Sequence, residues 1–282
     1  MRKVIANQTF DEERSLYNLK NADVLNCDFK GLKDGESVLK ETRNVKVEGC
    51  SFSLRYPLWH AKDFALISSQ MDDKTRAPIW YAKKGAIEKT TINGIKALRE
   101  SRDISVKDCT INSEEFGWKC SRIKVENTSL ESQYLFFDSK DIEINKLNMK
   151  GKYSFQYIKN LKITDSVLDT KDAFWHSKNV TVENCVIKGE YLAWFSENLT
   201  LKHCTITGTQ PFCYAKNLTL IDCTMEGCDL AFEYSSVNAD LKGNIKSIKN
   251  PLSGTITVDG VEEIIEKEAV KRCTGKVVVR QK

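Results

Sequence analysis

The chain has 282 residues, 41% of them hydrophobic and 29% charged, and its 43 basic and 39 acidic side chains give a formal net charge of +4. This composition is typical of a folded globular protein and excludes wholesale disorder. The balanced charge argues against nucleic acid and anionic membranes as partners, and no apolar run approaches the roughly 18 residues of a membrane span. Because residues 1–14 are polar and lack a signal-peptide core, we expect a cytoplasmic protein.

A nine-residue phrase recurs along the chain: an Asn or Asp, aliphatic residues at alternating positions, a small residue and a closing apolar residue. Examples are NADVLNCDF at 21–29, NVTVENCVI at 179–187 and NLTLIDCTM at 217–225. Eight successive closing residues are spaced by 19: Ile92, Ile111, Leu130, Met149, Leu168, Ile187, Ile206 and Met225. Apolar alternation is the period of a strand with one buried face, and helical repeats need about 33 residues or more.

The repeat therefore predicts an all-β fold, a single-stranded right-handed parallel β-helix of about 11–12 coils that stack at about 4.8 Å. We expect one β-helix domain over residues 1–282, with an N-terminal cap at 1–20, coils at 21–260 and a C-terminal cap at 261–282. In the C-terminal cap, Val261, Ile264 and Ile265 recur at helical spacing. This pattern predicts a small helix that covers the open end of the β-helix.

Two columns of the repeat are expected to be structural. The Asn or Asp that opens each phrase tolerates left-handed backbone and forms local hydrogen bonds, so it predicts a corner ladder. A second column holds six of the ten cysteines, which predicts buried free thiols. Because no Cys-x-x-Cys pair or Cys/His cluster occurs, no metal and no cofactor is expected. These six cysteines are Cys27, Cys50, Cys109, Cys185, Cys204 and Cys223.

All five tryptophans occupy one further column, and columns beside it are rich in Tyr, His and carboxylates. Two interpretations are open: an aromatic stack that supports the coils, or a groove whose rings and polar groups bind sugars. The predicted ligand-binding residues, from the middle of the chain, are Glu115, Trp118, Lys119, Tyr134, Tyr153, Tyr157, Trp175, Tyr191 and Trp194. If a reaction occurs, the candidate acids or bases are Asp138, Asp172 and His176.

The leading functional hypothesis is the binding of an oligosaccharide or polysaccharide along these aromatic columns. Two alternatives stay open: a carbohydrate-active enzyme, such as a glycoside hydrolase or lyase, without recognised motifs, and a structural β-helix without a small-molecule ligand. The sequence leaves the oligomeric state open.

The repeated phrase with its Cys, together with LRYPLWH at 54–60, FGWKC at 116–120 and DAFWHS at 172–177, resembles a bacterial family of single-domain parallel β-helices of unknown function. That family lies within the pectin-lyase-like superfold, and the resemblance covers essentially the whole chain. It implies the fold and supplies no catalytic residues. The motif set of polygalacturonase-type enzymes is missing from this sequence.

Overall fold

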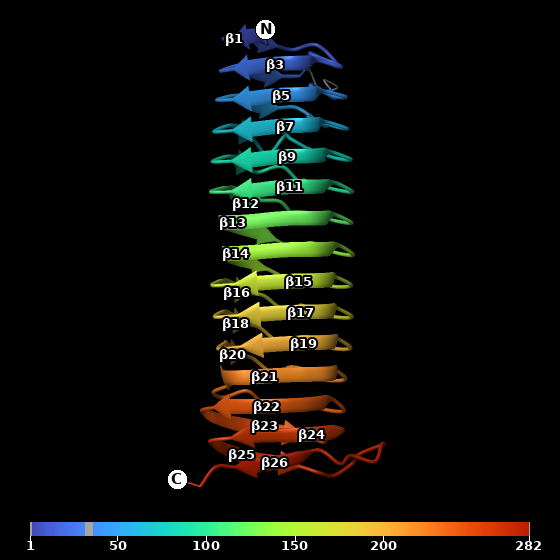
Figure 1. Ribbon diagram of the computed structural model, residues 1–282, viewed down its shortest axis with the longest axis vertical. Coiled ribbons are helices and arrows are strands. Elements are labelled where there is room, and N and C mark those ends of the chain that lie inside the picture. Colours follow the sequence, from blue (N-terminus) through green and yellow to red (C-terminus); the bar gives the residue numbers. More distant parts are fainter. Residues whose placement is uncertain (1, 32–35, 282) are drawn as a thin grey trace. The chain divides into compact units, whose positions relative to one another are not determined.

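The computed structural model describes residues 2–31 and 36–281. The chain forms two compact units, residues 1–143 and 144–282. In each unit, long and short strands alternate along the chain and stack in parallel on their counterparts from the neighbouring coil (Figure 1). The predicted all-β parallel β-helix is thereby confirmed. The described residues include no helix with the length and apolarity that a membrane span requires.

The first unit begins one coil earlier than the repeated phrase indicated. Residues 3–10, expected within the N-terminal cap, form two strands that pair in parallel with the strands of the next coil, with Ile5 beside Val24. The strands of this unit are β1 (Lys3–Ala6), β2 (Thr9–Phe10), β3 (Lys20–Leu25), β4 (Asp28–Lys30), β5 (Arg43–Glu48), β6 (Ser51–Ser53), β7 (Lys62–Ile67), β8 (Gln70–Met71), β9 (Lys83–Glu88), β10 (Thr91–Ile92), β11 (Arg102–Lys107), β12 (Thr110–Asn112) and β13 (Ser121–Ser132).

The second unit continues the same pattern beyond the last regular phrase. Its long strands pair in a strict 19-residue register, as where Leu161, Val180, Leu199 and Leu218 follow one another across the coils. Strand β14 (Lys140–Gly151) contains the boundary between the units, and the strands that follow it are β15 (Lys159–Thr164), β16 (Val167–Asp169), β17 (Lys178–Glu183), β18 (Val186–Lys188), β19 (Glu197–Lys202), β20 (Thr205–Thr207), β21 (Lys216–Thr224), β22 (Ser236–Lys242), β23 (Asn244–Lys249), β24 (Ser253–Val258), β25 (Gly260–Ile265) and β26 (Lys276–Val279).

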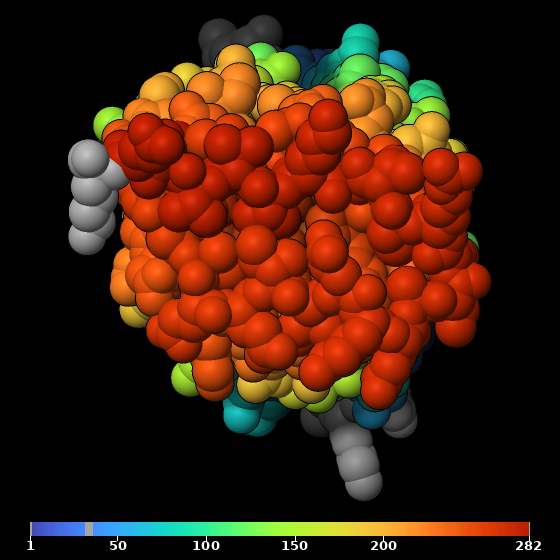
Figure 2. All heavy atoms as spheres, turned by 90° about the horizontal axis from the view of Figure 1, so that it is seen from below, coloured from blue at the N-terminus to red at the C-terminus, as the bar shows by residue number. Residues whose placement is uncertain are grey.

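The helix predicted near the C-terminus is wrong. Residues 260–265 form strand β25, which pairs in parallel with β23 so that Ile245 lies beside Val261 and Ile248 beside Ile264. Val261, Ile264 and Ile265 fit a helical period and are also β-branched, which suits a strand. Pairing with strand β23, whose Ile245 and Ile248 are buried, favours the strand over the helix, because tertiary contacts override weak local preference. Figure 2 shows the second unit from its C-terminal end, where the red and orange atoms of the last coils face the viewer.

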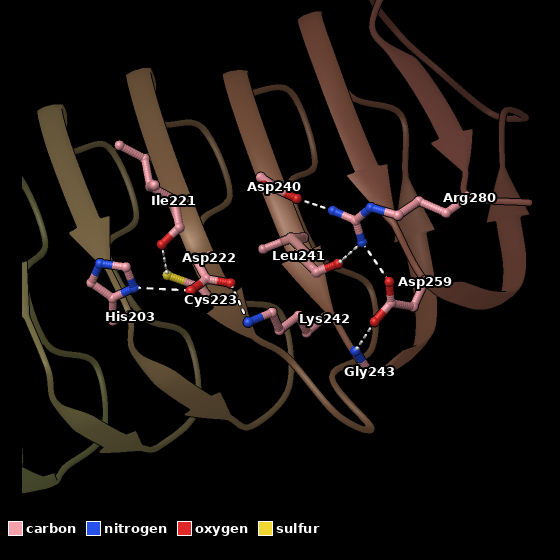
Figure 3. A network of polar contacts seen from close by, with 10 residues as sticks. All are labelled: His203, Ile221, Asp222, Cys223, Asp240, Leu241, Lys242, Gly243, Asp259 and Arg280. Carbon is pink, nitrogen blue, oxygen red and sulfur yellow. Dashed lines mark hydrogen bonds and ion pairs between the residues drawn. The ribbon is translucent and has the colours of Figure 1, made fainter. Parts of the chain in front are cut away.

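Arg280, just after β26, fastens the last strand to earlier coils (Figure 3). Its guanidinium pairs with the carboxylates of Asp240 and Asp259 and donates a hydrogen bond of 2.7 Å to the carbonyl oxygen of Leu241. Asp259 in turn accepts a hydrogen bond from the backbone N–H of Gly243. Arg280 therefore joins three successive coils of the second unit.

Both columns predicted to be structural have that role. Asn and Asp of the corner column have positive φ, and their side chains form ladders in which Asn198 Nδ2 donates to Asn179 Oδ1 at 3.0 Å and Asn217 Nδ2 donates to Asn198 Oδ1 at 2.8 Å. The six cysteines of the second column are buried free thiols. Each thiol bonds to backbone carbonyls, as where Cys185 Sγ donates to Glu183 O at 3.1 Å.

The thiols give a first testable prediction. Nine of the ten cysteines are buried and Cys273 is half-buried. Burial raises the pKa of Cys120, Cys213 and Cys228 to about 12, so these thiols stay protonated and unreactive at neutral pH. Titration with a thiol reagent should detect at most one rapidly reacting group in the native protein and ten after denaturation without reductant. Detecting several disulfides in the denatured sample would contradict this expectation.

Candidate functional site

The tryptophan column is half-buried and belongs to the framework of the coils. The five indoles each donate a hydrogen bond from Nε1 to a backbone carbonyl of the next coil. Trp175, for example, bonds to Tyr191 O at 2.6 Å, and Gln156 in the same column bonds to Asp172 O at 2.9 Å. These bonds fasten each coil to its successor, so part of the column's role is structural.

In the first unit, this column forms one continuous stack of rings and cations. Trp59 and Trp80 lie parallel with ring centroids 5.3 Å apart. The Arg99 guanidinium lies between Trp80 and Trp118, at 5.0 and 5.2 Å from their centroids, a cation–π arrangement that the sequence indicated. Within the described part of the chain, Arg99 Nε has no hydrogen-bond partner, so the two indoles and an ion pair with Glu100 Oε1 at 3.8 Å offset the burial of its charge.

The predicted site residues of the first unit are five: Glu115, Trp118, Lys119, Tyr134 and Asp138. Glu115 forms an ion pair with Lys96 at 3.5 Å, and Tyr134 meets Trp118 edge to face with centroids 5.9 Å apart. Lys119 and Asp138 are exposed. No tight cluster of carboxylates forms among these residues.

The second unit brings seven predicted residues together on three successive coils. We call them, with the neighbouring rings of Phe195 and Tyr214, the second-unit wall. Its members are Tyr153, Tyr157, Asp172, Trp175, His176, Tyr191, Trp194, Phe195 and Tyr214.

Four of these rings form an outward ladder. The centroid distances are 4.9 Å from Tyr157 to His176, 5.1 Å from His176 to Phe195 and 4.9 Å from Phe195 to Tyr214, with interplanar angles of 12° or less. Tyr157 and Phe195 are each 45% exposed. Because the ring faces cover one another, the ladder presents mainly ring edges to solvent. His176, a candidate acid or base, is held between two aromatic faces.

Tyr191 is oriented differently from this ladder. Its ring lies at 83° to the indole of Trp194, and Trp194 is itself parallel to Trp175 at 5.4 Å. The Tyr191 face is therefore turned about a right angle from the stacked rings. Lys171 Nζ lies 5.2 Å from the Tyr191 centroid, and Lys152 Nζ lies 4.6 Å from the centroid of Tyr153.

Asp172 occupies the column position between these two tyrosines, one coil from each. The residue is only 7% exposed, and its carboxylate oxygens are not among the fully buried unpartnered side-chain atoms of the described residues. Desolvation raises the pKa of Asp172, against the opposing charges of Lys171 and Lys152. The two tyrosines of this column on either side of Asp172 lie about 10 Å apart by the coil spacing, and the aspartate side chain between them is much shorter than theirs.

Three charged neighbours of Asp172 were missed from the sequence: Lys152, Lys171 and Glu190. Lys171 Nζ lies 2.7 Å from Glu190 Oε2, and the backbone N–H of Asp172 donates to Glu190 O at 3.0 Å. The sequence contained a signal for the ion pair. Lys171 and Glu190 have opposite charges and are 19 residues apart, so they occupy the same position in successive coils. Phe195 and Tyr214 stand in the same column as His176 and could have been included for the same reason.

The raised pKa of Asp172 gives a second prediction. A folded-state pKa above the unfolded value means that stability is fully present below about pH 3.9 and is lost as pH rises through the folded pKa. Asp172→Asn, which cannot ionise, should therefore raise the urea midpoint at about pH 7, and this gain should shrink toward about pH 3.5. Asp229→Asn, three coils further in the same column, is the control. A lower midpoint for Asp172→Asn at pH 7 would contradict the expectation.

The described residues contain no group of three or more His, Cys, Asp or Glu that could hold a metal ion. The second-unit wall and its neighbours comprise stacked rings, one largely buried carboxyl group and an ion pair between successive coils. Fold and site together define a parallel β-solenoid with a wall of aromatic residues.

The chain belongs to the family described as "Protein of unknown function (DUF3737)", whose model matches residues 3–278. This match confirms the family resemblance inferred from the sequence. Among curated proteins, none matches the chain.

Three solved structures are reported as similar. A surface adhesin of Streptococcus pneumoniae, PfbA, is 6% identical, with 98% of this chain and 82% of that chain covered and a TM-score of 0.41. A variant tailspike of Escherichia coli bacteriophage HK620, in complex with a hexasaccharide, is 8% identical, with coverage of 98% and 71% and a TM-score of 0.42. The A-module of the mannuronan C-5 epimerase AlgE6 of Azotobacter vinelandii is 10% identical, with coverage of 99% and 89% and a TM-score of 0.26.

Proposed function

We propose that the second-unit wall binds a carbohydrate chain. The observation that carries this proposal is Asp172, a residue that is 7% exposed in an aromatic column and whose carboxylate oxygens are not among the fully buried unpartnered side-chain atoms of the described residues, so they face solvent. Desolvation of this carboxylate is partial, as its raised pKa indicates, and a polar group in such surroundings gains from a hydrogen-bond donor. Sugar hydroxyls are donors that could satisfy this carboxylate from the solvent side.

The neighbouring groups suit the same ligand class. The half-buried ring of Tyr191 offers an apolar surface for the C–H face of a sugar, while Lys171 and Glu190 beside it can bond to hydroxyls. Because the columns repeat at about 4.8 Å, a chain of sugars that lies across the coils would meet comparable groups at successive steps. The ring edges of Trp175 and Trp194 border this path.

The test is a glycan array followed by titration of tryptophan fluorescence with each oligosaccharide retained. Tyr191→Ala and Asp172→Ala should each raise the Kd roughly tenfold, which corresponds to about 1.4 kcal/mol. Asp229→Ala, from the same column, and Tyr17→Ala, which is 53% exposed in the first unit, are matched controls and should bind like the wild type. An array without a retained glycan would refute the proposal.

A structural scaffold without a ligand is the second candidate, favoured by the indole hydrogen bonds that fasten one coil to the next. Trp175→Phe removes the bond of 2.6 Å to Tyr191 O and keeps an aromatic ring. If the wall is only structural, this variant should lose stability while no glycan binds to the wild type. Binding of any glycan that Tyr191→Ala weakens would exclude the purely structural role.

A further inference from the structure

The first unit has one column that carries a cation in five successive coils. The registers of β3, β5, β7, β9 and β11 (Figure 1) place these cations one after another: Lys20, Arg43, Lys62, Lys83 and Arg102. We call these five residues the basic column. Lys62 is half-buried and the other four are exposed. By the coil spacing, the residues follow one another at about 4.8 Å and extend over about 19 Å.

Neighbouring carboxylates leave most of the repulsion within the basic column uncompensated. The ion pairs formed by the described residues of the first unit all involve other cations. Four carboxylates lie within two residues of the column along the chain, and Arg99 and Arg122 already pair with two of them. The other two are Glu41 and Asp63, against five positive charges. Like charges directly opposite one another on neighbouring strands destabilise a sheet, so this arrangement costs stability.

The geometry of the coil does not require a cation at this position. In the second unit the same column contains Glu197, which lies beside Lys178 and pairs with it at 2.9 Å. Ser121 occupies the column beside Arg102. Because an acidic and a neutral residue both fit, the five consecutive cations are a property of the first unit and not of the repeat. A partner that supplies anions would offset their repulsion.

We propose that the basic column binds the anionic headgroups of a lipid bilayer. This inference goes beyond the proposed carbohydrate binding, since it concerns the first unit and a different class of partner. Lys and Arg side chains near an anionic leaflet are attracted to it within about a Debye length, which is about 8 Å at physiological ionic strength.

The position of the column favours a bilayer over a soluble polyanion. Each cation directly precedes or follows residues with a left-handed backbone, as where Asn44 and Asp63 have φ of 53° and 52°. The column therefore stands at a corner of the coil, which is convex and has no groove walls. Mobile headgroups in a flat layer can gather beside each cation of such an edge. A soluble polymer would lose conformational freedom by straightening along it, without gaining the contacts of a groove.

The net charge of the chain does not reveal this segregation of cations. The overall value of +4 argued against an anionic membrane, because it measures the balance of charges and not their positions. Most cations of the neighbouring columns are compensated locally, as where Lys107 pairs with Glu126 at 3.2 Å. The excess of positive charge in the first unit is thus concentrated in one line of side chains.

The experiment sediments the full chain with vesicles of phosphatidylcholine alone or with about one part in three of phosphatidylserine. The protein should bind the mixed vesicles only, and about 0.5 M NaCl should release it. Lys62→Glu combined with Lys83→Glu should weaken binding about tenfold or more. Lys74→Glu combined with Lys89→Glu is the matched control, because it changes the net charge equally at exposed lysines outside the column. Its binding should stay within about threefold of the wild type.

A second measurement distinguishes a binding surface from an ordinary solvated face. Lys62→Glu places a carboxylate between Arg43 and Lys83, so this variant should raise the urea midpoint while it weakens binding to the mixed vesicles. Lys89→Glu should not raise the midpoint. Circular dichroism verifies that each variant is folded, and the vesicle composition and salt series on the wild type need no variant.

Each result bears on the assignment. Binding to mixed vesicles that falls with salt and with the column substitutions supports it. Equal binding to both kinds of vesicle, or equal losses from the column and control variants, overturns it. Retention of single-stranded DNA or heparin through the same column, without binding to vesicles, would show that the partner is a soluble polymer. Glycan binding at the second-unit wall is measured separately, so its failure leaves this inference standing.

Discussion

Replacing Phe155 with alanine should lower the free energy of unfolding of the second unit by about 3–5 kcal/mol, the usual cost for a buried phenylalanine. The Phe155 side chain is fully buried and stacks on Phe174 with ring centroids 5.1 Å apart. Its removal leaves a cavity in the centre of the coils, and the regular register of the strands on either side limits how far neighbours can collapse into it. Urea unfolding followed by circular dichroism measures the effect.

Tyr157→Ala is the control for this prediction, because Tyr157 lies two residues further along the same coil and its side chain is exposed. We expect a loss of about 1 kcal/mol or less from Tyr157→Ala, the cost of one stacking contact with His176. Equal losses for the two substitutions would mean that the outward ladder stabilises the coils as much as the interior does. That result would contradict the division between core and wall described here.

Gly189→Ala should destabilise the second unit by about 3 kcal/mol. Gly189 has φ of +155°, and a Cβ there would lie 1.7 Å from the carbonyl oxygen of Thr170 in the preceding coil. Since that neighbour is backbone, one coil would have to move away from the other. Glu190 and Tyr191 follow directly, so binding at the second-unit wall should weaken at the same time.

Gly227→Ala is the control for Gly189→Ala, because at Gly227 an added Cβ changes the backbone preference without meeting any neighbouring atom. Gly227 has φ of +69°, and nothing lies within 4 Å of a Cβ built on it. Its replacement should cost only the left-handed conformation, about 1 kcal/mol. Similar losses at Gly189 and Gly227, measured by the same urea unfolding, would show that contact with Thr170 is unimportant.

The stacking of the coils was predictable from sequence because identical roles recur every 19 residues. Val106, for instance, lies beside Ile87 and Val125 as the column of aliphatic residues requires. The corner positions were also predictable, since Asn and Asp are the residues that accept a left-handed backbone. Even Lys84 and Arg122, the exceptions in that column, have positive φ, which shows that position in the coil decides the conformation.

The backbone of the wall could not be predicted in this way. Tyr153, Phe155 and Tyr157 all have φ between 55° and 60°, a conformation that bulky residues seldom adopt. Their local preference opposes it, and only the neighbouring coils enforce it. The orientation of each ring follows from these corners, so the sequence could place Asp172 in an aromatic column without revealing its burial or its proximity to Glu190.

The uniform register has a consequence for how such a chain changes in length. Leu161, Val180 and Leu199 occupy one column at intervals of 19, whereas Ala22 pairs with Val45 at an interval of 23. A gene that gains or loses a block of 19 codons in the second unit shifts every later residue by one full coil and leaves each column intact. Blocks of other sizes must bulge outward at a corner. Duplication of whole coils is therefore the simplest mutation that extends the wall by another ring.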